Sequence, residues 1–161
     1  DDLLEEASEK LRSLSFELAS STLYRVGLAD AVRELCESMS ERYGIRFRFD
    51  GDGEGVDLED TTATVLFKAV RELLFNVVKH SNATEATVSI EREGGLLKVV
   101  SEDDGAGIHQ IQEGDDVAPA QGIGLFGIRE RLRDLGGTMR IASVPGVKTR
   151  VSLYVPTKEG E

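Results

Sequence analysis

One predicted helix carries four polar side chains of the types that serve binding sites and catalysis: Glu72, Asn76, Lys79 and His80. At about 100° per residue they lie within roughly a quarter-turn of one another, beside a broad apolar stripe. The helix would therefore pack on a core and present a carboxylate, an amide, an ammonium and an imidazole along its edge. By itself the pattern fits a functional edge and a solvated flank equally well, because a helix C-terminus favours a cationic imidazole.

A second group of residues follows a predicted strand directly, at Asp104-Gly105-Ala106-Gly107. Glycines beside a carboxylate let the backbone approach a flat ligand, and the Asp can accept hydrogen bonds from an exocyclic amine. A plain Asp-Gly turn explains the same letters. The motif is therefore weak when it is read alone.

The third group is Gly122-Ile123-Gly124-Leu125-Phe126-Gly127, which opens a helix whose unpaired N–H groups can cradle phosphates. Its spacing matches the dinucleotide fingerprint G-x-G-x-x-G. That fingerprint needs a strand immediately before it and an acid about 20 residues later. A loop precedes it here and Arg140-Ile141-Ala142-Ser143 follows, so the Rossmann interpretation fails. The chain also contains no P-loop motif.

Other kinds of site find little support. The two histidines, His80 and His109, cannot build a zinc site with these neighbours. The Gly-rich stretch 50–55 lacks the ligand spacing of an EF-hand and is expected to be a surface loop. The lone Cys36 excludes an internal disulfide and is expected to be a buried thiol.

The elements that must position these groups follow from periodicity. An apolar seam over residues 4–18 alternates spacings of three and four and predicts a helix that is either amphipathic or cut from a longer bundle. Further helices are expected over 28–43, ended by Gly44, over 61–80, and over 125–135, ended by Gly136 and Gly137. Strands are expected at 45–49, at 86–90 and 96–100 as one hairpin, and at 138–142 and 149–155 as a second.

This order of elements predicts an α+β fold, a two-layer α/β sandwich with helices on one face of a mostly antiparallel, mixed sheet, preceded by an N-terminal helical stub. We expect the stub to cover residues 1–26 and the main domain 27–161. The net charge of −11 disfavours a nucleic-acid surface, since phosphate binding needs clustered Lys and Arg. The absence of a long apolar run or signal peptide in the sequence favours a cytoplasmic module and is compatible with a parent protein anchored in the inner membrane.

Taken in order, the motifs E-x-x-x-N-x-x-K-H, D-x-G-x-G and G-x-G-L-x-G resemble the N, G1 and G2 boxes of the Bergerat-fold ATPases, the group of histidine kinases, DNA gyrase and mismatch-repair ATPases. The wording RELLFNVVKHSNAT with GIGLFGIRERLRDLGGTMRI is most similar to sensor histidine kinases of the nitrate-sensor class. The likeness covers residues 11–156. Residues 11–32 resemble the end of that class's dimerisation and phosphoacceptor domain.

The resemblance implies ATP and Mg²⁺ as ligands and assigns a role to each motif. Asn76 would hold Mg²⁺, Glu72 would polarise the attacking group or help order the metal, and Lys79 and His80 would lie near the phosphates. Asp104 would bind the adenine amine. The remaining nucleotide-binding residues that it implies are Gly105, Gly107, Gly122, Gly124, Leu125, Gly127 and Thr149.

Two further features follow from the same resemblance. Residues 108–121 would form an ATP lid that orders on nucleotide binding. Thr149 stands where the family has the Thr of a Gly-Thr motif, with Lys148 in place of the Gly. The implied parent is a homodimer that phosphorylates a His on its own dimerisation helix and passes the phosphoryl group to a LuxR-type response regulator.

The resemblance therefore predicts the ATP-binding catalytic domain of a two-component sensor histidine kinase. A Bergerat-fold serine kinase of the anti-sigma type is one alternative, disfavoured by the heptad stub before the first strand. A non-enzymatic nucleotide-sensing module is another, disfavoured by the presence of both Asn76 and Asp104.

Overall fold

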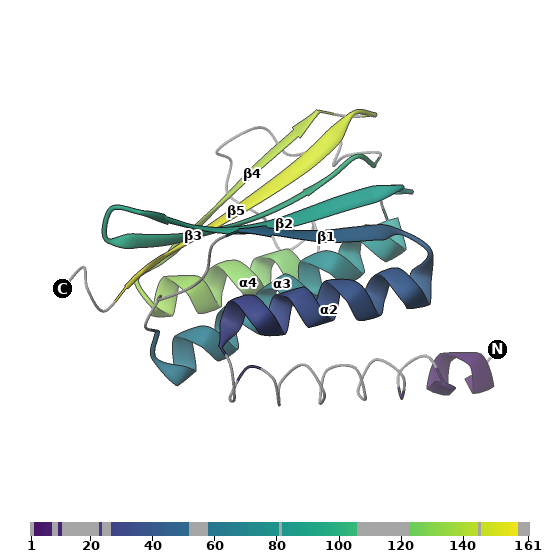
Figure 1. The fold of residues 1–161 in the computed structure, drawn as a ribbon, viewed down its shortest axis with the longest axis horizontal. Helices are drawn as coiled ribbons and strands as arrows, with labels where there is room; N and C mark the ends of the chain where they lie inside the picture. The colour runs from purple at the N-terminus through teal and green to yellow at the C-terminus, as the bar shows by residue number, and fades with distance from the viewer. Residues whose placement is uncertain are drawn as a thin grey trace.

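The computed structural model describes residues 2–7, 10, 23, 27–51, 58–80, 82–105, 123–144 and 146–157. Among these residues, five strands form one sheet, and three helices pack against the same face of it (Figure 1). None of the described helices covers the other face, which we call the open face. The predicted two-layer α+β architecture is thus confirmed. The strands are β1 (Arg46–Gly51), β2 (Glu85–Glu93), β3 (Leu96–Asp103), β4 (Thr138–Val144) and β5 (Lys148–Pro156).

The strands lie in the order β1-β2-β3-β5-β4. β2 with β3 and β4 with β5 form the two predicted hairpins, and β5 also pairs antiparallel with β3. β1 runs parallel to β2. A parallel pair needs a crossover connection, which the helix between the two strands supplies. The sheet is therefore mixed and mostly antiparallel.

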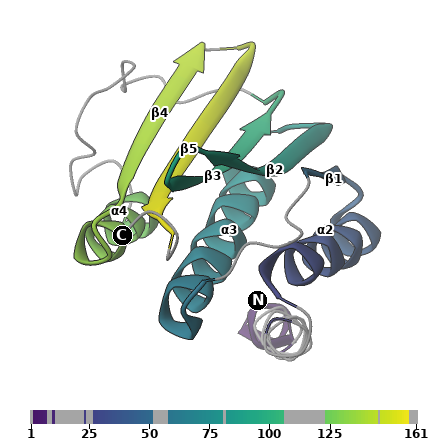
Figure 2. The same cartoon turned by 60° about the vertical axis from the view of Figure 1, so that its left-hand side comes forward.

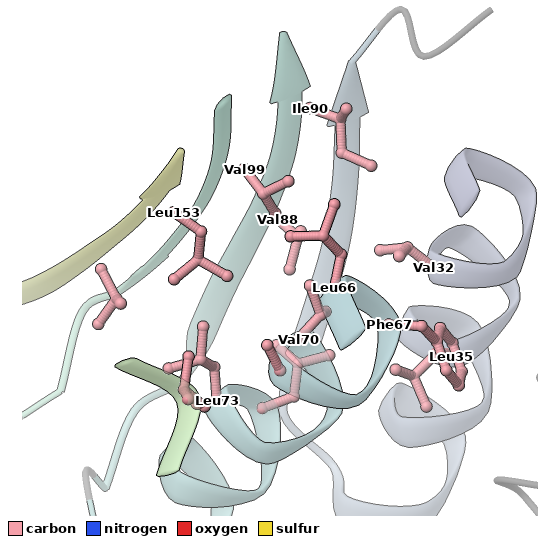
Figure 3. Close-up of a cluster of buried hydrophobic side chains, with 14 of the residues drawn as sticks. Val32, Leu35, Leu66, Phe67, Val70, Leu73, Val88, Ile90, Val99 and Leu153 are labelled. Atoms are coloured by element: carbon pink, nitrogen blue, oxygen red, sulfur yellow. The ribbon is translucent and has the colours of Figure 1, made fainter. Parts of the chain in front are cut away.

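Helix α3 (Asp60–His80) lies between α2 (Leu28–Tyr43) and α4 (Ile123–Asp134), as Figure 2 shows. Its apolar stripe faces the sheet and supplies much of the core, in which Leu66, Val70 and Leu74 are fully buried. Figure 3 shows this stripe meeting side chains of α2 and of the central strands. The residues labelled there are Val32, Leu35, Leu66, Phe67, Val70, Leu73, Val88, Ile90, Val99 and Leu153.

Helix α2 ends where Gly44 adopts the left-handed conformation (φ 69°) and its N–H donates to the carbonyl of Ser40, as the sequence predicts. The Ser40 hydroxyl accepts from the N–H of Phe47 at 2.9 Å, which joins the helix to β1. Cys36 lies buried on the same helix, and burial raises the pKa of its thiol to about 12. This thiol is a protonated core side chain.

Most observed elements are slightly longer than expected, whereas α2 has the expected bounds. β1 extends through Asp50 and Gly51, because a glycine at position 51 allows close approach to β2: a Cβ there would lie 2.8 Å from both N and O of Ile90. α4 begins at Ile123 and so contains Gly124 and Gly127. The boundary expected after residue 26 stays a prediction, as does the heptad seam, which lies largely outside the described residues. No helix in the described part combines the length and apolar character needed to cross a bilayer.

Candidate nucleotide-binding site

The last turns of α3 carry the first predicted group. Glu72 and Asn76, one turn apart, are half-buried beside the apolar stripe, and Lys79 is exposed near the helix end. The apolar stripe of the same helix packs on the sheet, so this polar edge lies beside the core. His80 is the last residue of α3, and its side chain lies outside the described part of the structure.

Glu72 lies directly against the start of α4. A Cβ added at Gly124 would collide with Oε1 of Glu72 and would lie 3.0 Å from its Cδ and 3.1 Å from its Cγ. Glycine is therefore what lets the two helices approach with this carboxylate between them. The first and third sequence motifs, 52 residues apart by subtraction of these numbers, meet in space here.

The second motif contains a buried carboxylate, but it belongs to Asp103. This residue ends β3 on the helix-covered side and is 8% exposed, and its Oδ1 accepts the N–H of Gly105 at 2.9 Å. Burial raises the pKa of the Asp103 carboxyl, and the Gly105 N–H partly offsets that rise. The nearby charges of Asp104 and Glu102 raise the pKa further.

Asp103 belongs to a row of small and polar side chains across the sheet. Its register partners are Ala86 on β2 and Thr149 on β5, and Thr149 is in turn paired with Ser143 on β4. Thr149 is 7% exposed, and its Oγ1 lies 3.3 Å from Oγ of Ser143. Directly opposed residues of antiparallel strands project from the same face, so the carboxylate and hydroxyls gather at one end of the covered face.

Asp104 lies in a different environment. Its side chain is exposed, and both of its oxygens already accept hydrogen bonds: Oδ1 from the N–H groups of Thr84 (2.8 Å) and Glu85 (3.1 Å), and Oδ2 from the Thr84 hydroxyl (2.6 Å). These bonds lower the pKa of the Asp104 carboxyl. The geometry therefore disfavours the expectation from the sequence that Asp104 binds the adenine amine.

Asp103 is not among the site residues expected from the sequence, although two signals in the sequence point to it. The spacing D-x-G-x-G, counted back from Gly107 and Gly105, begins at Asp103. The alternation of β3 also places Leu97, Val99, Ser101 and Asp103 on the buried face. Side chains of a strand alternate between its two faces, so residues at even separations from Leu97 lie on the buried face. Asp103 is at such a separation and Asp104 is not.

The connectivity of the chain brings the helix edge and the polar row to the same end of the molecule. α3 ends at His80, and a short connection leads to Glu85, the first residue of β2. The second residue of that strand, Ala86, is the register partner of Asp103. The end of α3 thus lies one short connection from the buried carboxylate, and α4 begins against Glu72.

The other predicted residues divide into two groups. Leu125 is a buried core side chain, and a Cβ at Gly127 would make only ordinary contact, 3.6 Å from Nη2 of Arg131. Their roles at a nucleotide stay predictions, as do those of the residues around them. Outside the described residues lie Gly107, Gly122, His109 and the expected lid 108–121.

The donor set suits a metal that is shared with a phosphate ligand. Within the described ranges, no group of three or more His, Cys, Asp or Glu side chains could hold a metal ion by itself. Mg²⁺ keeps several waters and is usually bound through one or two protein oxygens together with substrate phosphates. The half-buried Asn76 amide, with Glu72 one turn before it, fits that mode.

Together, a buried carboxylate and hydroxyl lie at the sheet end, near a helix edge with amide and carboxylate groups. The chain matches the profile of the histidine kinase-, DNA gyrase B-, and HSP90-like ATPases over residues 61–159 and belongs to that family. ATP is the nucleotide of the family. The expected membership of the Bergerat-fold ATPases is thereby confirmed.

Among its relatives the chain is similar to histidine kinases. It is 39% identical to the sensor histidine kinase NarS of Mycobacterium tuberculosis over 96% of this chain and 35% of that protein. It is 35% identical to the histidine-protein kinase/phosphatase UhpB of Salmonella typhimurium, over 93% and 29%, and 33% identical to the oxygen sensor histidine kinase NreB of Staphylococcus carnosus, over 92% and 42%. The chain thus spans less than half the length of these relatives.

Solved structures show the same fold. The histidine kinase domain of the blue-light activated histidine kinase EL346 from Erythrobacter litoralis superimposes with a TM-score of 0.71 at 20% identity, over 94% of this chain and 75% of that one. A nucleotide-free form of the catalytic domain of histidine kinase ThkA gives a TM-score of 0.64 at 18% identity, over 81% and 91%. The described elements therefore have the arrangement of a histidine kinase catalytic domain.

Proposed function

We propose that this chain is the ATP-binding catalytic domain of a two-component sensor histidine kinase. It would transfer the γ-phosphoryl group of ATP to a His on a dimerisation domain, for relay to an Asp of a response regulator, which we propose to be of the LuxR type. The observation that carries the proposal is the buried pair of Asp103 and Thr149 at the sheet end beside the end of α3. The family match and the sensor kinases among the relatives support it.

At the base end, the proposal assigns Asp103 in place of Asp104. An ionised Asp103 would accept the hydrogen bond of an adenine amine, and guanine, which has a carbonyl oxygen at that position, would be repelled. The Thr149 hydroxyl lies beside it and can donate or accept. Gly105, whose N–H already holds the Asp103 carboxylate, fixes the orientation of that group.

At the phosphate end, Asn76 would hold Mg²⁺ and Glu72 would polarise the attacking imidazole or help order the metal. The metal would neutralise charge on the transferred phosphoryl group. Lys79 and His80 would lie near the phosphates, with the glycines of α4 opposite. Phosphoryl transfer depends mainly on positioning and electrostatic stabilisation, and such a site needs few side chains beyond these.

The acceptor His lies elsewhere in this proposal. The sequence contains only His80 and His109, and neither belongs to the heptad seam at residues 4–18 that resembles the dimerisation helix. We therefore expect this chain to bind Mg-ATP without labelling itself. A chain extended upstream through a first dimerisation helix should acquire base-stable, acid-labile phosphate from γ-labelled ATP.

The test combines this phosphate-labelling assay with calorimetry of ADP binding. Asn76→Ala should lose the Mg²⁺ dependence of ADP binding while the fold is retained. Glu102→Gln removes a carboxylate one residue from Asp103 on the opposite face, where it pairs with Arg150, and should bind ADP like the unchanged chain. Acid-labile phosphate on His80 or His109 of this chain would contradict the proposal. Transfer of the phosphoryl group to a serine of another protein would favour the alternative of an anti-sigma-type serine kinase.

A further inference from the structure

Asp104 is the carboxylate that the base-binding assignment leaves without a role, and it is engaged in an unusually complete set of hydrogen bonds. Three donors reach its two oxygens at 2.6–3.1 Å, all from Thr84 and Glu85. Its own N–H donates to the carbonyl of Glu85 at 3.2 Å. Four hydrogen bonds thus connect the residue after β3 to the start of β2.

The segment that Asp104 binds is the connection that follows α3. Asn82 has a left-handed conformation (φ 53°), and Ala83 is buried between it and Thr84. Non-glycine residues adopt this conformation rarely, and surrounding contacts must hold it. Thr84, two residues further on, is fixed at both of its backbone groups and at its hydroxyl: its N–H and hydroxyl donate to Asp104, and its carbonyl accepts the N–H of Arg46 at 3.0 Å.

The two ends of the nucleotide site depend on different restraints. Asp103 is held by ladder pairing with Ala86 on one side and Thr149 on the other, so its position does not require Asp104. The end of α3, which carries Asn76 and Lys79, continues into β2 through a short connection that includes residues 82–84. The Asp104 carboxylate ties this connection to the base end through its bonds to Thr84 and Glu85.

We infer that Asp104 is a positioning residue that, with Thr84, holds the end of α3 in register with the base-binding end of the site. This inference rests on the proposed function. It assigns to Asp104 no contact with the base and no contact with the metal. Its effect passes through the connection 82–84 to the helix edge that binds the phosphates and Mg²⁺.

The experiment measures ADP affinity of this chain by calorimetry with and without Mg²⁺, in four variants. Losing the charge-assisted bonds in Asp104→Ala should reduce the Mg²⁺-dependent gain in affinity about tenfold, with little change in metal-free affinity. Thr84→Val loses one bond and should reduce the gain about threefold, whereas Thr84→Ser keeps the hydroxyl and should keep the gain. Asn76→Ala serves as the reference that loses the gain altogether.

A purely structural role predicts a different pattern. Asp104→Ala would then show a lower urea midpoint, but at temperatures where it is folded its ADP affinity would change equally with and without Mg²⁺, or not at all. Either result overturns the inference. If Asn76→Ala retains the full Mg²⁺ gain, the metal assignment of the proposed function fails as well. If Thr84→Ser behaves like Thr84→Val, the hydroxyl bond carries no positioning effect and the inference is wrong.

Discussion

Two neighbouring carboxylates at the end of β3 lie in opposite environments. Asp103 is on the helix-covered face, buried beside Thr149, and its pKa is raised by burial. Asp104 is exposed, accepts three hydrogen bonds, and has a lowered pKa. A charge that is buried with little compensation costs stability and is usual at functional sites, whereas a charge that is fully hydrogen-bonded locally stabilises the fold. This contrast supports the proposals that Asp103 recognises the ligand and that Asp104 is a positioning residue.

The largest expected effect is on nucleotide affinity. Asp103→Asn replaces a charged acceptor by a neutral amide and should weaken ADP binding about 10–100-fold, the amount that hydrogen bonds to charged groups contribute. Calorimetry at neutral pH measures it, with Glu102→Gln as the matched control. Equal losses in the two variants would mean that net charge, rather than a specific contact, determines affinity.

The ionised carboxylates of Asp103 and Asp104 should have opposite effects on the stability of the fold. Because burial raises the folded-state pKa of Asp103 above its ordinary value of 3.8, its contribution is fully favourable below that value and is lost as pH rises through the raised pKa. Asp103→Asn should therefore raise the urea midpoint at pH 7. Protonation of Asp103 also removes the charged acceptor for the adenine amine. The ADP affinity of the unchanged chain should therefore fall as pH drops through that pKa.

For Asp104 the sign reverses. Its folded-state pKa is lowered, so its stabilisation is present above the ordinary value of 3.8 and is lost as pH falls through the lowered pKa. Asp104→Ala should cost about 1 kcal/mol at pH 7 by removal of its hydrogen bonds. Urea titrations between pH 3 and 7 measure this difference. A common sign for both residues would contradict the contrast between them.

A smaller effect separates the two glycines of α4. Gly127→Ala meets only ordinary contacts and should stabilise the helix by about 0.5–1 kcal/mol. Gly124→Ala pushes a methyl group into Glu72 and should lack that gain. In a Glu72→Ala background the two substitutions should become equivalent, a double-mutant cycle that measures the contact. Persistence of the difference would place the strain elsewhere.

The smallest effect is expected on the open face of the sheet. Arg150 donates to Glu102 at 2.6 Å, but its side chain is 50% exposed. Exposed ion pairs contribute about 0–1 kcal/mol, so Arg150→Ala should change the unfolding free energy by less than about 1 kcal/mol and leave ADP affinity unchanged. A larger loss of stability would contradict the small contribution expected of an exposed ion pair. A loss of ADP affinity would show that the open face contributes to binding.

The sequence predicts best what depends on local periodicity. The stripe of α3, the two hairpins and the stop at Gly44 all follow from short-range patterns, and the structure confirms them. The position of β5 between β3 and β4 and the parallel pairing of β1 with β2 depend on long-range contacts that no local pattern reports. The same holds for the contact of Glu72 with Gly124.

The assignment of base binding to Asp104, which the geometry disfavours, has a different origin. A one-residue shift in a strand moves a side chain to the other face, so an assignment by proximity to glycine is not enough. Counting from Leu97 and Val99 would have selected Asp103 from the sequence alone. The hydrogen bonds of Asp104 to Thr84 and Glu85 could not have been predicted in this way, since they join segments about 20 residues apart.

The central claim, that Asp103 and not Asp104 binds the base, is tested most directly with an ADP analogue lacking the exocyclic amine. Calorimetry would compare ADP with purine riboside diphosphate on the unchanged chain, on Asp103→Asn and on Asp104→Asn. We expect the unchanged chain and Asp104→Asn to prefer ADP, by about tenfold or more, and Asp103→Asn to lose the preference. A preference that disappears in Asp104→Asn and survives in Asp103→Asn would contradict the assignment.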